Sequence, residues 1–199
     1  MTKFFFDQYP EFVQADSRRL RGFSPVTAET LSVRHQSLLP QWMLEDLRVL
    51  DLGSCLAATG QWALAQGCAH YTGVEAQAQL ADLSRQLLAR HWREDQFTIH
   101  CEDLRSFLRA AAAQGQQWDV VVAVGVVYAF LDTYGFFEDI ARVCDYAVAM
   151  DSIYPWNMAS ADVSIIDVIR IQHINSGRAN TAFQGAGARP SPAAARVMW

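Results

Sequence analysis

Residues 48–75 constrain the fold of this chain most, because two strands, a tight turn and a helix are combined there. Residues 49–52 form a short, mostly apolar run of the kind found in strands buried in parallel sheets. Gly53 then allows a sharp turn, and a second strand ends in Glu75, about 20 residues beyond that turn. This order predicts a βαβ unit that binds a nucleotide-like ligand.

An acid inside the first strand discriminates between two kinds of ligand. Asp51 lies two residues before Gly53, where dinucleotide-binding units usually carry an apolar residue. A carboxylate there would repel a pyrophosphate but attract an ammonium or sulfonium group, and S-adenosylmethionine (SAM) carries both. The pattern G-x-G-x-x-G is also absent, because Cys55 and Ala58 occupy its second and third glycine positions. A Rossmann-like turn that binds no cofactor is the alternative interpretation.

The stretch V-L-D-L-G-S-C-L-A-A-T-G, followed by G-V-E, resembles the first two motifs of class I SAM-dependent methyltransferases. The resemblance is to the small-molecule branch of that family, with Cys55 and Ala57 in place of two family glycines. It implies that Glu75 accepts hydrogen bonds from the ribose hydroxyls of SAM and that Asp51 compensates its positive end. It also implies that three turn residues offer backbone groups to the methionine part of SAM: Gly53, Ser54 and Cys55.

The rest of the core alternates between helices and strands. Strands are predicted at residues 71–74, 97–101, 118–124 and 146–150, in addition to the first one. Five strands alternating with four helices predict an α/β, Rossmann-like, doubly wound and mostly parallel sheet with helices on both faces. The antiparallel hairpin that ends the family's sheet is expected to be missing.

Asp103 and Leu104 follow the third strand and are predicted to bind the cofactor. In the family that this chain resembles, an acid at this point meets the adenine amino group, and Asp103 matches it better than Glu102. The alternative is that Asp103 caps the helix that begins at Leu104, since aspartate is a favoured N-cap. Both roles can coexist.

The loop after the fourth strand should face cofactor and acceptor, because ligands of open α/β sheets bind beyond the carboxyl ends of the strands. Gly125 is the predicted cofactor contact there, and Tyr128 is a candidate catalytic residue that would position the acceptor. His35 is a second catalytic candidate, as a base, if its helix covers the site; a structural role is the alternative. Asp151 and His173 are weaker candidates.

Three parts are predicted along the chain: a helical and aromatic arm at 1–47, a SAM-binding core at 48–155, and an acceptor-side or capping segment at 156–199. The arm could cap the cofactor cleft or pack on the side of the domain. Residues 163–174 fit a helix or a strand equally. A capped helix begins at Ser191 and stops after about two turns, so we expect the chain to be truncated.

Composition restricts the remaining classes. The net charge of −5 argues against a broad nucleic-acid surface. Four cysteines without C-x-x-C spacing indicate neither a zinc site nor a disulfide framework, and no His, Asp or Glu cluster has metal spacing. No signal peptide or membrane span is indicated, so a cytoplasmic location is expected.

The leading hypothesis is therefore a SAM-dependent methyltransferase with a small-molecule or metabolite acceptor. A tRNA-modifying methyltransferase is an alternative within the enzyme class. A non-catalytic binding module that keeps the fold is the alternative from another class.

Overall fold

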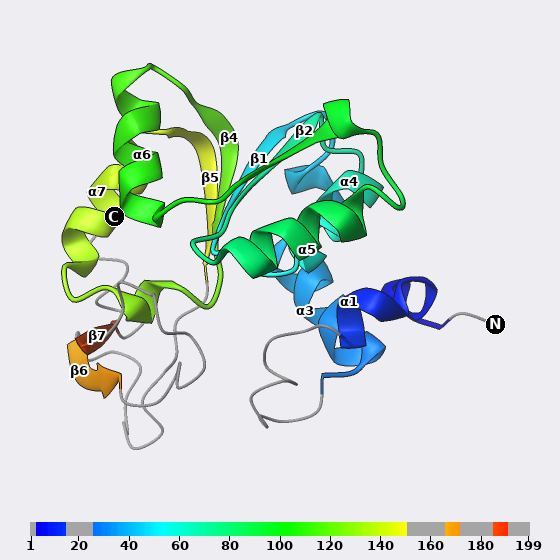
Figure 1. The fold of residues 1–199 in the computed structure, drawn as a ribbon, viewed down its shortest axis with the longest axis horizontal. Helices are drawn as coiled ribbons and strands as arrows, with labels where there is room; N and C mark the ends of the chain where they lie inside the picture. Colours follow the sequence, from blue (N-terminus) through cyan, green and yellow to red (C-terminus); the bar gives the residue numbers. More distant parts are fainter. Residues whose placement is uncertain (1–2, 15–25, 151–165, 172–184, 191–199) are drawn as a thin grey trace.

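The computed structural model describes residues 3–14, 26–150, 166–171 and 185–190 (Figure 1). Five parallel strands form the main sheet, in the order β3-β2-β1-β4-β5. They are β1 (Arg48–Leu52), β2 (His70–Val74), β3 (Phe97–His100), β4 (Trp118–Ala123) and β5 (Cys144–Met150). The chain runs outward from β1 to β3 and then returns to β4, so the order reverses between β1 and β4. The predicted doubly wound sheet is confirmed, and a ligand site is expected at this reversal.

Helices cover both faces of the sheet (Figure 1). One face carries α1 (Pro10–Gln14), α3 (Ala28–Leu38), α4 (Ala58–Ala65) and α5 (Ala78–Leu88). The other carries α6 (Leu104–Ala113) and α7 (Thr133–Ala141). Short 3-10 turns lie at η1 (Phe5–Gln8), η2 (Gln41–Met43), η3 (Glu94–Gln96) and η4 (Val127–Ala129). Alternate residues of β1 divide between two cores, Val49 toward α4 and Leu50 toward α6, because side chains of a strand alternate between faces.

The described part of the aromatic arm packs into the core on the α4 face. Phe6 and Phe12 are fully buried there. The Phe6 amide donates to the Ser32 hydroxyl at 3.1 Å. Glu11 pairs with His91, three residues beyond α5, at 2.6 Å. Side-on packing of the arm is therefore observed, while a capping role over the cofactor stays a prediction.

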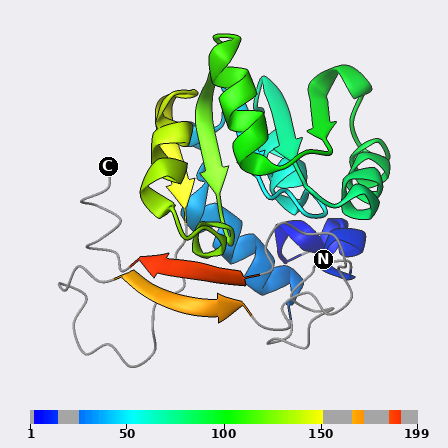
Figure 2. The same cartoon turned by 60° about the vertical axis from the view of Figure 1, so that its left-hand side comes forward.

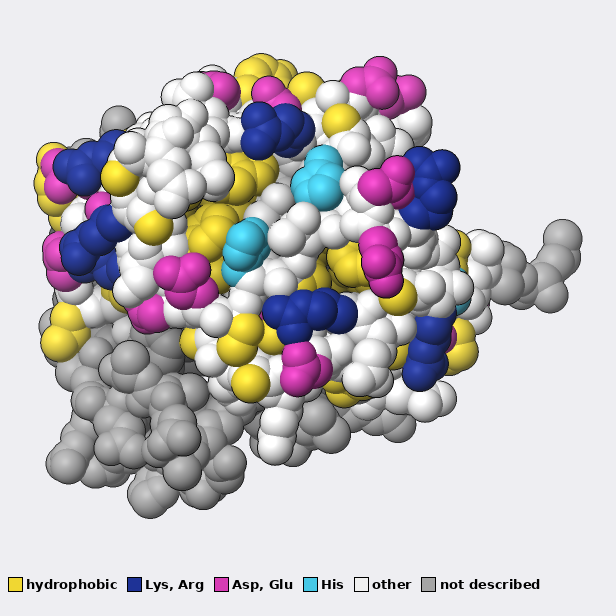
Figure 3. Space-filling view, turned by 45° about the horizontal axis from the view of Figure 1, so that its top comes forward, with side chains coloured by type: hydrophobic (Ala, Val, Ile, Leu, Met, Phe, Trp, Pro, Cys, Tyr) yellow, Lys and Arg dark blue, Asp and Glu magenta, His cyan; other side chains and the backbone are white. Residues whose placement is uncertain are grey.

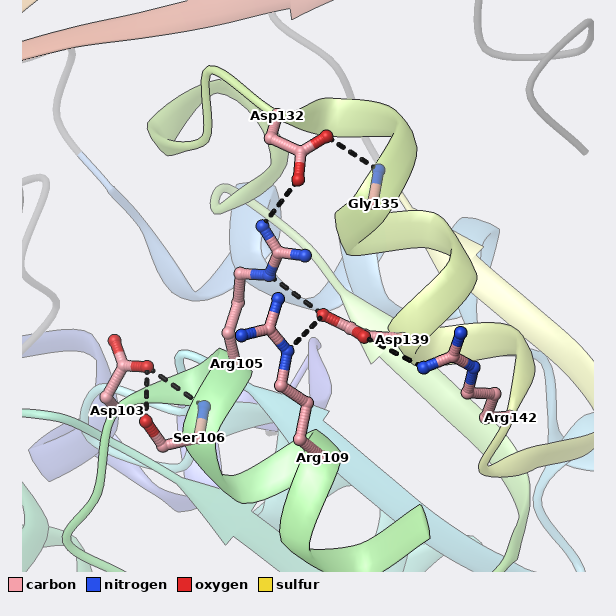
Figure 4. Close-up of polar contacts among 8 residues, drawn as sticks. All are labelled: Asp103, Arg105, Ser106, Arg109, Asp132, Gly135, Asp139 and Arg142. Carbon is pink, nitrogen blue, oxygen red and sulfur yellow. Dashed lines mark hydrogen bonds and ion pairs between the residues drawn. The ribbon is translucent and has the colours of Figure 1, made fainter. Parts of the chain in front are cut away.

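A cluster of charged residues joins the two helices of the opposite face (Figure 4). Asp139 of α7 is buried, with 4% of its side chain exposed, and accepts hydrogen bonds from Arg105 at 2.8 Å and Arg109 at 3.3 Å. Asp132 caps α7 through the Gly135 amide and also pairs with Arg105 at 2.8 Å. These contacts fix α6 and α7 relative to each other. The loop that follows β4 leads into α7.

The C-terminal part contributes two described strands, β6 (Ile166–Ile171) and β7 (Gly185–Pro190). They pair antiparallel as a separate two-stranded sheet. Figure 2 shows this sheet beyond the carboxyl ends of the parallel strands, where β7 lies beside η4. Residues 166–171 thus form a strand rather than a helix, and the strand at 185–190 was not predicted. Within the described residues, the main sheet ends at β5. The helix expected at Ser191 lies outside those residues.

Candidate functional site

The turn after β1 is held against the end of β2 by backbone hydrogen bonds. The N–H groups of Gly53 and Ser54 both donate to the Val74 carbonyl, at 2.9 and 3.0 Å. Gly53 has a φ of 75°, and a Cβ at this position would clash with the Val126 side chain. Glycine is required there for both reasons. The turn therefore lies directly against the loop that follows β4, at the point where the strand order reverses.

Two residues of the turn adopt backbone conformations that usually belong to glycine. Cys55 has a φ of 50° and Ala57 a φ of 55°, both in the left-handed region. These are the two positions at which the sequence replaces glycines of the methyltransferase motif. The left-handed path of the turn is therefore kept without the glycines, at a cost of roughly 1–2 kcal/mol for each residue.

Glu75 connects the end of β2 to this turn. Its carboxylate accepts one hydrogen bond from the Cys55 amide at 3.1 Å and another from the Gln77 amide at 2.9 Å, and its side chain is buried. A carboxylate has about four acceptor sites on its two oxygens, so it can accept further hydrogen bonds from a ligand. The predicted ribose contact of Glu75 is compatible with this geometry and stays a prediction.

Asp51 is buried beneath the turn, with 4% of its surface exposed. Burial raises the pKa of its carboxyl group from 3.8 to about 7. The Tyr71 hydroxyl donates a hydrogen bond to it at 2.7 Å and opposes this shift. Arg34 and the Thr59 hydroxyl also favour the charged form, whereas Glu75 disfavours it. The charge of Asp51 near neutral pH therefore depends on what lies beside it, and a cationic ligand would favour the ionised form.

The contact between Tyr71 and Asp51 was not predicted from the sequence. Tyr71 is fully buried, and its pKa is raised well above 10 by burial and by the neighbouring Asp51. Gly60 allows the close approach, because a Cβ on this residue of α4 would come within 2.5 Å of the tyrosine ring. A glycine inside a helix was the sequence signal for this contact, since it usually has a packing reason.

Asp103 caps α6, as the alternative interpretation proposed. One of its oxygens accepts hydrogen bonds from the Ser106 amide at 3.0 Å and the Ser106 hydroxyl at 3.1 Å (Figure 4). The adenine contact of Asp103 is not tested by this arrangement and stays a prediction. The Leu104 side chain is buried in the core on the α6 face, so any cofactor contact of Leu104 would use its backbone.

The remaining predicted residues are placed as follows. Gly125 has a φ of 76° and lies in the loop after β4, where a Cβ would meet no described atom within 4 Å. Tyr128 belongs to η4, and only its backbone is described. His35 is buried, with its Nδ1 2.8 Å from the Leu31 carbonyl and its Nε2 3.3 Å from the Thr59 hydroxyl. These contacts favour the structural alternative for His35 over direct proton transfer with an acceptor. Asp151 and His173 lie outside the described residues.

The described residues contain no group of three His, Cys, Asp or Glu side chains that could hold a metal ion. Among the same residues, no helix has both the length and the apolar character needed to cross a membrane. Figure 3 shows one face of the molecule, on which positive and negative side chains are interspersed rather than gathered by sign.

No protein-family model matches the sequence, and no curated protein matches it. Several solved structures do match the fold. The N-terminal domain of EvdMO1, solved with S-adenosylhomocysteine (SAH) and D-fucose, is similar over 85% of this chain and 69% of that one, with a TM-score of 0.59 and 13% identity. The SAM-dependent methyltransferase of Agrobacterium tumefaciens is similar over 67% of this chain, with a TM-score of 0.53 and 16% identity.

These similarities confirm the predicted fold of class I SAM-dependent methyltransferases. They also show a difference in size, since the match spans 48% of the Agrobacterium tumefaciens protein. It spans 33% of a Streptococcus mutans protein assigned to the same class, at a TM-score of 0.51 and 15% identity.

Proposed function

We propose that this chain binds SAM and transfers its methyl group to a small-molecule acceptor. The observation that carries the proposal is the connection between Glu75 and the turn after β1. The acid at the end of β2 is hydrogen-bonded to the amide of Cys55, and the turn keeps a left-handed path at the two replaced glycines. A turn that had lost its ligand would have no need of this strained backbone path.

The residues present fit SAM by their chemistry. Glu75 would hold the ribose hydroxyls, the turn from Gly53 to Cys55 would receive the methionine part, and Asp51 would offset its positive charge. Asp103, Leu104 and Gly125 would complete the adenine side. The bound cofactor would supply an electrophilic methyl group on a sulfonium. The protein then has to align the acceptor and exclude water, and orientation alone can contribute roughly 7–11 kcal/mol to barrier lowering.

The acceptor is proposed to be a small molecule or metabolite rather than RNA. The net charge of −5 and the mixed charges on the face in Figure 3 do not favour a phosphate backbone. The EvdMO1 domain, which has the same fold, was solved with a sugar, D-fucose. Tyr128 would position the acceptor, because η4 follows β4 at the ligand-binding edge. The four cysteines, all within the described residues, form no disulfide, which fits the reducing cytoplasm.

Calorimetric titration of the protein with SAH and, separately, with NAD tests the cofactor. SAH should bind and NAD should not. The variant E75Q should weaken SAH binding at least tenfold, because it removes a charged acceptor of the ribose hydroxyls. The matched variant E102Q should bind normally, since the backbone amide of Glu102 donates to the Glu75 carbonyl and the substitution keeps this contact. Preferential binding of NAD would refute the proposal.

Turnover of SAM across a panel of small hydroxy, amino and thiol acceptors, with tRNA included, tests the acceptor class. Methylation of a small molecule supports the proposal. Methylation of tRNA alone would assign the acceptor class to RNA instead. Tight SAH binding without any turnover would indicate a non-catalytic binding module.

A further inference from the structure

The loop that joins β4 to α7, residues 124–132, is held near both of its ends. Near its start, the Val126 side chain occupies the space that a Cβ on Gly53 would need, so the loop lies against the turn after β1. Near its end, the ring of Phe130 stacks on Phe136 of α7, with 4.0 Å between the ring centroids. The loop therefore has a defined position beside the predicted cofactor turn.

Arg105 connects the last residue of this loop to α6. It lies in the first turn of α6, two positions after Asp103. Its Nη1 donates to Asp132 at 2.8 Å, and its Nε donates to Asp139 of α7 at 2.8 Å (Figure 4). The other carboxylate oxygen of Asp132 accepts from the Gly135 amide at 2.9 Å. One aspartate side chain therefore caps α7 and also holds the arginine of α6.

Burial and space distinguish Arg105 from the next arginine of α6. Arg109 also lies beside Asp139, at 3.3 Å, but 60% of its side chain is exposed, against 20% for Arg105. Exposed ion pairs contribute little to stability. A Cβ on Gly135 would clash with the Asp132 carboxylate and would lie 2.8 Å from Nη2 of Arg105, so α7 fits closely around this pair. Among the residues that the structure describes, Arg105 alone contacts both carboxylates.

We propose that Arg105 is a positioning residue that holds the acceptor side of the site in register with the cofactor side. This role rests on the proposed function, in which Asp103 and Leu104 lie on the adenine side and Tyr128 on the acceptor side. Arg105 follows the first two directly, and Asp132 lies four residues after Tyr128. A guanidinium held by two carboxylates is fixed in direction as well as in position, because its donors form a rigid planar fork. The acceptor loop is thereby fixed to the helix that begins on the adenine side.

The expected effect falls on methyl transfer rather than on cofactor binding. Arg105 lies outside the set of residues proposed to touch SAM, so the loss of its pair with Asp132 leaves those contacts in place. The loop then loses its connection to α6, and the acceptor is aligned less well with the methyl group. A displacement of about 1 Å can slow a reaction about a hundredfold. The loss should therefore appear in kcat and not in the dissociation constant of SAH.

Asp132 offers the most selective variant, because serine is also a favoured N-cap but is too short to reach Arg105. D132S should lower kcat, measured with the acceptor that the panel identifies, roughly ten- to hundredfold. It should change the dissociation constant of SAH by less than about twofold. The matched control R109A removes the exposed partner of Asp139 and should keep kcat within about twofold. A wild-type kcat in D132S, or an equal loss of SAH affinity, would overturn the proposal.

The variant R105K tests whether the arginine and the aspartate act as a unit. Lysine keeps a cation beside the buried Asp139, so the variant should fold, but it lacks the planar fork that holds two carboxylates. R105K should lower kcat in the wild-type background and have little further effect in D132S. Independent losses that multiply in the double variant would overturn the role assigned to Arg105.

Hydrogen exchange tests the position of the loop without any cofactor. The amides of Ala129 and Phe130 close the turn η4 through hydrogen bonds of 2.9 and 3.3 Å. Their exchange should be about fivefold faster or more in D132S and unchanged in R109A. Exchange at the wild-type rate in D132S would overturn the proposal, because the loop would then be held without Arg105. If the wild type does not bind SAH, the proposed function fails, while this exchange still decides whether Arg105 holds the loop.

Discussion

Asp51 should make the protein less stable near neutral pH, and replacing it by asparagine should reverse this. The carboxyl group has a pKa of about 7 in the folded protein and an ordinary value of 3.8, mainly because it is buried. The folded state therefore binds the proton more tightly than the unfolded state. The contribution of Asp51 to stability must then fall as the pH rises from about 4 to about 7, and stay constant above that range.

The size of the effect follows from the same two values. They differ by about three pH units, and one unit corresponds to about 1.4 kcal/mol, so the full penalty above pH 7 is about 4 kcal/mol. At pH 5 it is only roughly 2 kcal/mol. Asparagine keeps the shape and accepts the hydrogen bond from Tyr71. The variant D51N should therefore be more stable than the wild type, and increasingly so between pH 5 and pH 8.

Urea unfolding at pH 5 and pH 8 measures this difference. A matched control is D103N, because asparagine caps a helix about as well as aspartate and should change stability by less than about 0.5 kcal/mol. D51N should at the same time weaken SAM binding, so stability and affinity should change in opposite directions. A D51N protein that is no more stable at pH 8 than the wild type would refute the electrostatic account of this site.

Two further variants test the backbone of the turn and the packing beneath it. In urea unfolding, A57G should be as stable as the wild type or more stable by up to about 1 kcal/mol, because it relieves a left-handed alanine. The control A63G, inside α4, should lose about 1 kcal/mol. Equal losses in the two variants would contradict the backbone strain assigned to Ala57. G60A should lose about 1–3 kcal/mol despite the better helix propensity of alanine, because its methyl group would press on the Tyr71 ring. A gain in stability for G60A would contradict the close contact between α4 and β2.

The sheet and the edge that carries the site could be predicted from the sequence because both depend on local patterns. The apolar runs of β1 and β4 indicate parallel strands, and acids at strand ends indicate the ligand edge. The hydrogen bond between Tyr71 and Asp51 could not be predicted in this way. It depends on how closely α4 packs on β2, which a single glycine decides. The contact between His35 and Thr59 likewise depends on where α3 packs on α4, and no local sequence pattern indicates this.

The two C-terminal strands show how far strand propensity alone can predict the fold. Residues 166–171 are rich in β-branched side chains, and a strand was one of two readings. Residues 185–190 are mostly glycine and alanine and end in proline, a composition that disfavours strands. Their pairing with β6 is a tertiary contact, and propensity does not indicate it.

The left-handed residues at positions 55 and 57 have a consequence for how such chains are recognised. A search that demands glycine at these positions rejects sequences in which the same backbone path is built with a cysteine and an alanine. The backbone path of the turn requires two other residues. They are a glycine whose missing side chain makes room for the loop after β4, and an acid on the next strand that binds an amide of the turn. A signature written on these two positions describes the turn by its physical requirements and admits relatives that have lost the other glycines.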